Sequence, residues 1–228
     1  MVALTTAGLV TGAVALTYGS PLGRPPDATT GVGTFKFTSH QRGQVARPVA
    51  YDPCEPIEIV VNDSSAPDGG GDIFLRALDE VSARTGLRFE VKGQTDERLG
   101  SGRRHGGGAW FSPVLVDWTS AKEVPELAGR VAGQAGSTAV GSGVGELRYV
   151  TGTVALDAPD LTRILQRPDG DAQVEAIIKH ELGHLVGLDH VDDPYELMND
   201  DNLGLSKFGP GDREGLAKLG RGRCLPGL

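Results

Sequence analysis

The chain has 228 residues, of which 39% are hydrophobic and 23% are charged. This composition allows one compact domain with a tail, or at most two small domains. A net charge of −8 argues against a nucleic-acid partner, because binding to a phosphate backbone depends on dense Lys and Arg. Gly accounts for 34 residues, about twice the usual share, which predicts many turns and long irregular connections.

The N-terminal stretch Met1–Tyr18 is apolar and carries no charge. We interpret residues 1–20 as a signal peptide or a membrane anchor, which predicts a secreted protein or one anchored outside the cytoplasm. Membrane association would then run through this stretch, and an apolar tail without a targeting role is the alternative. Residues 21–53 are rich in Pro, Gly, Thr and Arg and predict a linker or surface arm, because they hold too little apolar surface to order themselves. The folded domain is expected over residues 54–228.

Periodicity along the rest of the chain predicts alternating strands and helices. Residues 56–62 alternate and are β-branched, as in a strand, whereas residues 72–85 place their apolar side chains on one helix face before Gly86. Further strands are predicted over 87–91, 112–118, 137–140 and 149–157, and further helices over 173–186 and 210–219. This order of elements predicts an α+β domain with a mixed sheet.

Three of the five histidines fall within residues 180–190. His180 and His184 are four residues apart on a predicted helix, so their side chains project from one face and can reach a single ion. Glu181 lies about 100° further round the helix and can stand beside a metal without being a ligand.

A third ligand has to come from beyond the helix. Gly187 can adopt a positive φ, end the helix and turn the chain back, which brings His190 towards the other two histidines. Three neutral imidazoles leave a fourth position for water, as in catalytic zinc sites. An ordinary helix with solvated histidines would explain neither the break at Gly187 nor the third histidine.

The pattern HExxHxxGxxH over residues 180–190 resembles the zinc signature of the metzincin metalloproteases, and Met198 resembles the methionine of the turn beneath their metal. Residues 187–190, 197–198 and 208–216 are most similar to the matrixins, including bacterial matrixin-type peptidases. The resemblance implies a metzincin-like mixed, mostly parallel twisted sheet, with an active-site helix and a C-terminal helix. It also implies that residues 54–228 form the catalytic domain.

The same resemblance implies the roles of individual residues. One catalytic Zn²⁺ would be held by His180, His184 and His190, with Glu181 as general base. The short strand Ser137, Thr138, Ala139 and Val140 would be the edge strand that pairs with a polypeptide substrate through main-chain hydrogen bonds. The resemblance therefore implies a zinc-dependent endopeptidase that hydrolyses extracellular proteins with a metal-activated water, and we expect a monomer.

Two further features leave alternatives open. Cys54 and Cys224 lack any CxxC spacing, so they are either inert thiols or one bridge, and we predict the bridge, which would fit an oxidising compartment. The acidic run from Asp189 to Asp201 invites a Ca²⁺ site, but it lacks EF-hand spacing, and a solvated loop is the preferred interpretation.

Two other functions compete with a peptidase. One is a catalytically inactive binding protein that keeps the metzincin fold and the metal. The other is an intracellular zinc hydrolase of a different substrate class, in which the N-terminal apolar stretch is incidental.

Overall fold

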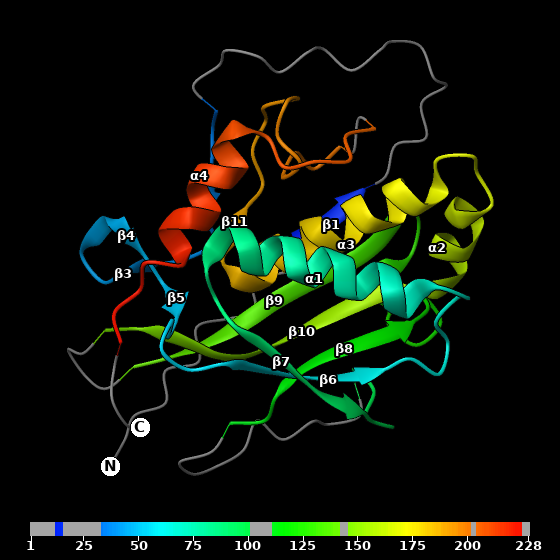
Figure 1. Cartoon of the computed structure of the whole chain (residues 1–228), viewed down its shortest axis with the longest axis horizontal. Helices are drawn as coiled ribbons and strands as arrows, with labels where there is room; N and C mark the ends of the chain where they lie inside the picture. The colour runs from blue at the N-terminus through cyan, green and yellow to red at the C-terminus, as the bar shows by residue number, and fades with distance from the viewer. Residues whose placement is uncertain (1–11, 16–32, 101–110, 142–145, 202–203, 225–228) are drawn as a thin grey trace.

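The computed structural model describes residues 12–15, 33–100, 111–141, 146–201 and 204–224 (Figure 1). The elements in chain order are β1 Gly12–Ala15, β2 Lys36–Phe37, β3 His40–Gln41, β4 Gln44–Pro48, β5 Ala50–Tyr51, β6 Ile57–Asn62, α1 Gly70–Thr85, β7 Phe89–Gln94, β8 Val114–Thr119, the 3₁₀ turn Pro125–Leu127, β9 Val131–Val140, β10 Arg148–Asp157, α2 Ala158–Leu165, α3 Gly170–Val186, β11 Leu188–Asp189 and α4 Pro210–Leu219.

The main sheet has the strand order β1-β9-β10-β8-β6-β7, with β5 also paired to β10. The pairs β10–β8, β8–β6, β6–β7 and β10–β5 are parallel, whereas β9 runs antiparallel to both β10 and β1. Helices α1 and α3 lie side by side across one face of this sheet, and α4 packs at its end (Figure 1). The predicted α+β fold with a mixed, mostly parallel sheet is therefore confirmed.

The hydrophobic core lies between the helices and the sheet. Helix α1 buries the predicted apolar stripe, which consists of Ile73, Phe74, Ala77, Leu78 and Val81. Strand β8 is buried at every position, as expected for a central strand covered on both faces. Helix α3 is buried all round from Ala176 to Val186, so the helix that carries the histidine motif is itself part of the core.

Strand β9 is longer than predicted. The sequence indicated only residues 137–140, but β9 spans Val131–Val140 and pairs with β10 from Gly133 to Val140, with one irregularity. Gly and Ser are common in this stretch and are depleted in strands generally, which hides the strand from propensity. Pairing along β10 and close packing against α3 order the segment instead.

Residues 33–53 of the segment predicted as an arm are part of the fold, and residues 21–32 lie outside the described residues. Strand β2 pairs with β11, β3 pairs with β4, and β5 joins the main sheet beside β10. The pairings of β2 and β5 are with distant strands, and Val49, Ala50 and Tyr51 are buried in the main core, so the order depends on tertiary contacts that composition alone did not predict. The ordered body thus begins before Cys54.

The N-terminal apolar stretch is described only where it forms β1. The rest of residues 1–20, predicted as a signal peptide or anchor, lies outside the described residues. Within the described ranges, the helices fall short of the length and apolar character that a membrane span requires.

A disulfide joins Cys54 to Cys224, with a Cα–Cα distance of 5.4 Å across 170 residues of sequence. The predicted bridge is confirmed. It ties the chain just before β6 to the chain that follows α4.

Replacing both cysteines (Cys54→Ser with Cys224→Ser) should lower the free energy of unfolding by about 2–5 kcal/mol, because the bridge limits the freedom of a long loop in the unfolded chain. Urea unfolding measures this difference. As a control, wild-type protein with the bridge reduced should unfold at the same urea concentration as the double variant. Equal stability of the oxidised wild type and the double variant would contradict a stabilising role.

Candidate metal centre

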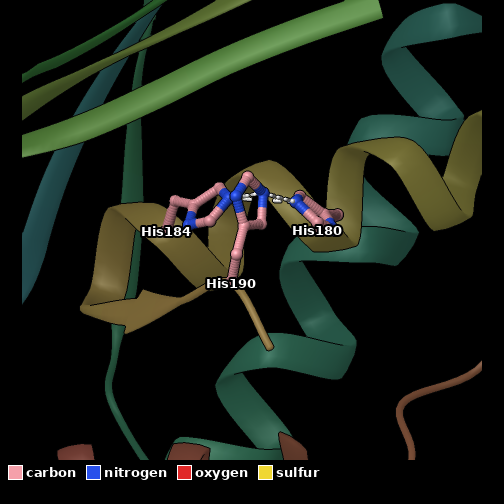
Figure 2. Close-up of side chains that lie close together, drawn as sticks. All are labelled: His180, His184 and His190. Carbon is pink, nitrogen blue, oxygen red and sulfur yellow. Dashed lines mark hydrogen bonds between the residues drawn. The ribbon is translucent and has the colours of Figure 1, made fainter. Parts of the chain in front are cut away.

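Three histidine side chains converge beside α3 (Figure 2). The Nε2 atom of His180 lies 2.9 Å from that of His184 and 3.0 Å from that of His190, and the Nε2 atoms of His184 and His190 are 3.0 Å apart. Each of the three nitrogens thus faces the other two. The structure brings together all three ligands that the sequence predicts.

Backbone carbonyls hold two of the rings by their other nitrogen. His180 Nδ1 lies 2.7 Å from the carbonyl oxygen of Leu197, and His184 Nδ1 lies 2.9 Å from that of Leu188. A carbonyl can only accept, so each Nδ1 donates, and each Nε2 of the neutral ring carries a lone pair. Such support by carbonyls is common for histidines that bind metals.

The Nε2 atoms of these two rings cannot satisfy one another by hydrogen bonding, because two lone pairs face each other at 2.9 Å. A cation shared by the three nitrogens would remove that repulsion, since zinc binds imidazole nitrogens at about 2.0–2.1 Å. Burial lowers the pKa of His184 to about 3 and lowers the pKa values of His180 and His190, so the rings stay neutral as ligands must. The triad can therefore hold a metal ion such as zinc.

The backbone reverses direction at Gly187. Its φ of 122° lies in the region that favours glycine, and its N–H donates to the carbonyls of Gly183 and His184, each at 3.1 Å. Strand β11 follows at once and pairs with β2, so the chain returns along the end of α3 and presents His190.

Glu181 has a different environment from the ligands. Its side chain is fully buried, and neither carboxyl oxygen has a hydrogen-bond partner. Burial raises the pKa of Glu181 well above its usual value. The side chain packs against β9 at Gly133, where a Cβ atom would lie 2.7 Å from Glu181 Cγ. A buried acid without partners next to a metal-ligand triad is a candidate for proton transfer.

Met198 is 1% exposed and lies against α3 at Gly183, the residue before His184. Its sulfur packs against the backbone of α3, because a Cβ atom added at Gly183 would lie only 2.6 Å from Met198 Sδ. The preceding residue, Leu197, supplies the carbonyl that orients His180. The turn at residues 197–198 therefore forms the floor of the site.

Two buried carboxylates tie this turn to α4. Asp212 accepts from the N–H groups of Leu197 at 2.5 Å and Met198 at 3.3 Å, and Glu196 accepts from those of Gly211 and Asp212, both at 2.8 Å. We call this arrangement the carboxylate clasp. Burial, together with the nearby Glu196, raises the pKa of Asp212 to about 7.

The predicted substrate strand is part of β9. Ser137 to Val140 pair with β10 on one side, and within the described ranges no strand pairs with their other side, since β1 lies beside Val131 to Ala135. The Ser137 hydroxyl points inward and donates to the Leu185 carbonyl at 2.7 Å.

The acidic run predicted as a solvated loop does not gather a ligand cluster of its own. Among the residues that the structure describes, two groups of three or more ligand-type side chains lie close enough to share an ion. One is the histidine triad. The other is Asp52 with Cys54 and Cys224, and its two cysteines are bonded to each other.

Sequence reasoning missed several residues that shape the site. Glu196 directly precedes the predicted Leu197-Met198 pair, but it lies in the acidic run, where its charge does not distinguish it from its neighbours. Gly133 was one glycine among many, and no local pattern marks its place beside Glu181.

No protein-family profile matches the chain, and no curated protein sequence matches it. Among solved structures, the chain is similar to archaemetzincin from Methanopyrus kandleri, with a TM-score of 0.43 and 17% sequence identity, over 71% of this chain and 93% of that one. This likeness is too distant to assign the chain to a family.

Proposed function

We propose that the protein is a zinc-dependent endopeptidase of the metzincin type, with matrixin-like features. The observation that carries the proposal is the triad of facing Nε2 atoms next to the buried, unpartnered carboxyl group of Glu181. The motif and its methionine turn support the same reading, because their residues also meet in space.

His180, His184 and His190 would hold the ion, and a zinc ion so held supplies Lewis-acid polarisation of a peptide carbonyl and acidifies a neighbouring water. A cation close to Glu181 favours its charged form and opposes the effect of burial. Glu181 can then take a proton from the attacking water and deliver it to the leaving amine, as general base and then general acid.

The outer edge of β9 supports an extended peptide as substrate. Main-chain groups of Ser137, Thr138, Ala139 and Val140 can pair with a peptide of almost any sequence, which fits a polypeptide substrate. Closer to Glu181, β1 pairs with residues 131–135 and occupies the same edge. A peptide that reaches Glu181 along β9 has to take the place of β1.

We also propose that the protein works outside the cytoplasm, either secreted or anchored. The disulfide supports this proposal, because such bridges persist in oxidising compartments. The stretch Met1–Tyr18 also supports export, because it is apolar and uncharged like the apolar part of an export signal.

Cleavage of casein and of a peptide library by the purified protein tests the function. We expect cleavage at internal bonds, loss of cleavage with a chelator, and recovery on adding zinc. Stoichiometric zinc without cleavage would favour a binding protein, whereas hydrolysis of esters or other amides alone would favour a hydrolase of another class.

The contact between Glu181 and β9 gives a second test. Gly133→Ala places a methyl group 2.7 Å from Glu181 Cγ and should displace that side chain, so we expect cleavage to fall about 100-fold while zinc stays bound. Steady-state kinetics and metal analysis measure the two effects.

Gly71→Ala is the matched control, because a Cβ atom there meets nothing within 4 Å. It should cleave at the wild-type rate. Wild-type activity of Gly133→Ala would show that Glu181 does not depend on this contact.

A further inference from the structure

The end of α3 has to be held in place for His190 to reach the site. The last carbonyls of a helix lack partners within the helix and need other donors. The Leu185 carbonyl accepts from the Ser137 hydroxyl at 2.7 Å. The Gly187 carbonyl accepts from the backbone N–H of Thr38 at 3.0 Å and from its hydroxyl at 3.3 Å. Side chains from β9 and from the segment after β2 thus close the end of the helix.

The hydroxyl groups of Ser137 and Thr38 are each hydrogen-bonded to a tyrosine hydroxyl. The Tyr51 hydroxyl lies 2.7 Å from Ser137 Oγ, and the Tyr149 hydroxyl lies 2.8 Å from Thr38 Oγ1. The Ser137 hydroxyl gives its one hydrogen to the Leu185 carbonyl at 2.7 Å, so Tyr51 is the donor to Ser137 Oγ. Between Thr38 and Tyr149 either hydroxyl can donate, since the Thr38 hydroxyl is 2.8 Å from Tyr149 and 3.3 Å from the Gly187 carbonyl. We call the two chains of hydrogen bonds the Tyr51 relay and the Tyr149 relay.

Both tyrosines keep a hydroxyl hydrogen available for these contacts. Each is 5% exposed, and their ring centroids are 5.6 Å apart. Burial raises the pKa of both Tyr51 and Tyr149, so both hydroxyl groups keep their hydrogen at any pH at which the protein works. The relays start on β5 and β10, two paired strands of the main sheet.

The carbonyls that the relays hold flank the metal ligands. Leu188, directly after Gly187, provides the carbonyl that orients His184, and His190 follows two residues later. A shift of the Gly187 carbonyl would therefore displace a ligand and the support of another ligand together. Strand β2, which pairs with β11, ends next to Thr38, so the two contacts act on the same short segment.

We propose that Thr38 and Ser137, each backed by a tyrosine, are positioning residues of the metal centre. They set its affinity for zinc by fixing the backbone reversal that delivers His190. This inference rests on the metal centre of the proposed function, but it does not require that the protein cleave peptides. Because Thr38 and Tyr51 both lie in residues 33–53, this segment would contribute to the metal centre.

The Tyr149 relay can be tested with a matched pair of variants. Thr38→Val keeps the shape of the side chain and removes the hydroxyl, whereas Thr38→Ser keeps the hydroxyl. Competition with a chromogenic chelator should show a zinc dissociation constant about tenfold higher for Thr38→Val and within about twofold of wild type for Thr38→Ser, since loss of a ligand's support costs 10–100-fold in affinity. The absorption spectrum of Co²⁺-loaded Thr38→Val should also change.

The Tyr51 relay has its own variants. Ser137→Ala removes the donor to Leu185 and should weaken zinc binding about tenfold, and Tyr51→Phe should have a smaller effect in the same direction. Thr162→Val is the matched control, because the Thr162 hydroxyl also donates to a backbone carbonyl, that of Ala158 in α2, at 2.7 Å. It should leave the zinc dissociation constant within about twofold of wild type.

Combining Thr38→Val with His190→Ala separates positioning from general destabilisation. If Thr38 acts through His190, the double variant loses less affinity than the product of the two single losses. Multiplicative losses, wild-type affinity of both Thr38→Val and Ser137→Ala, or an equal loss in Thr162→Val would each overturn the proposal. Wild-type protein that binds no stoichiometric zinc would instead refute the metal centre, and zinc binding without cleavage would refute only the peptidase.

Discussion

Replacing Glu181 with Gln should reduce peptide cleavage by about 10²–10⁴-fold and leave one zinc ion bound per chain. Glutamine keeps the size of the side chain but cannot accept the proton of the attacking water, and a positioned acid–base group contributes a factor of this size. Glu181 is not one of the three residues that would bind the metal, so its replacement should not alter the ligand set. Steady-state kinetics on a casein-derived peptide and metal analysis of the same sample measure both effects.

Glu90→Gln is the control for this change. Glu90 lies exposed on β7 and forms an ion pair with Lys92 at the surface, so its loss of charge should not affect turnover. If Glu181→Gln cleaves peptide as fast as wild type, Glu181 is not the general base. If it loses zinc, its role is structural.

Replacing His190 with Ala should raise the zinc dissociation constant by more than about 100-fold. The loss of a group that supports a ligand costs 10–100-fold in affinity, and the loss of a ligand should cost more. Cleavage should disappear at limiting zinc and return only in part with excess zinc. Chelator competition and kinetics at several zinc concentrations test this result.

His40→Ala provides the same chemical change at an exposed position on β3. It should bind zinc as the wild type does. Unchanged zinc affinity in His190→Ala would show that the third imidazole is not a ligand, and would contradict the convergence seen in Figure 2.

The convergence of the three histidines could be predicted from sequence because their geometry is local. His180 and His184 are one helical turn apart, and Gly187 and His190 follow within six residues, so helix geometry and one backbone reversal fix the arrangement. The buried stripe of α1 could be predicted for the same reason.

The hydrogen bonds that support the site could not be predicted from the sequence, because they join distant parts of the chain. Thr38 and Tyr149 are 111 residues apart in sequence, and Tyr51 and Ser137 are 86 apart. Strand β9 has a composition that propensity assigns to a loop, and the segment around Thr38 pairs with β11 and packs Phe37 against the core. Sequence patterns describe neighbours along the chain, whereas these contacts depend on the finished fold.

The carboxylate clasp has a consequence for local unfolding of the protein. Helix α4 has no side-chain cap from Gly209 at its own N-terminus, and two of its first N–H groups are satisfied by Glu196, while Asp212 on α4 satisfies the turn that carries Met198. If either partner detaches, buried donors on the other are left without acceptors, at about 1–3 kcal/mol each. Local opening of the C-terminal helix and of the turn that carries Met198 should therefore be a single cooperative event, with amide hydrogens of both segments exchanging at one common rate.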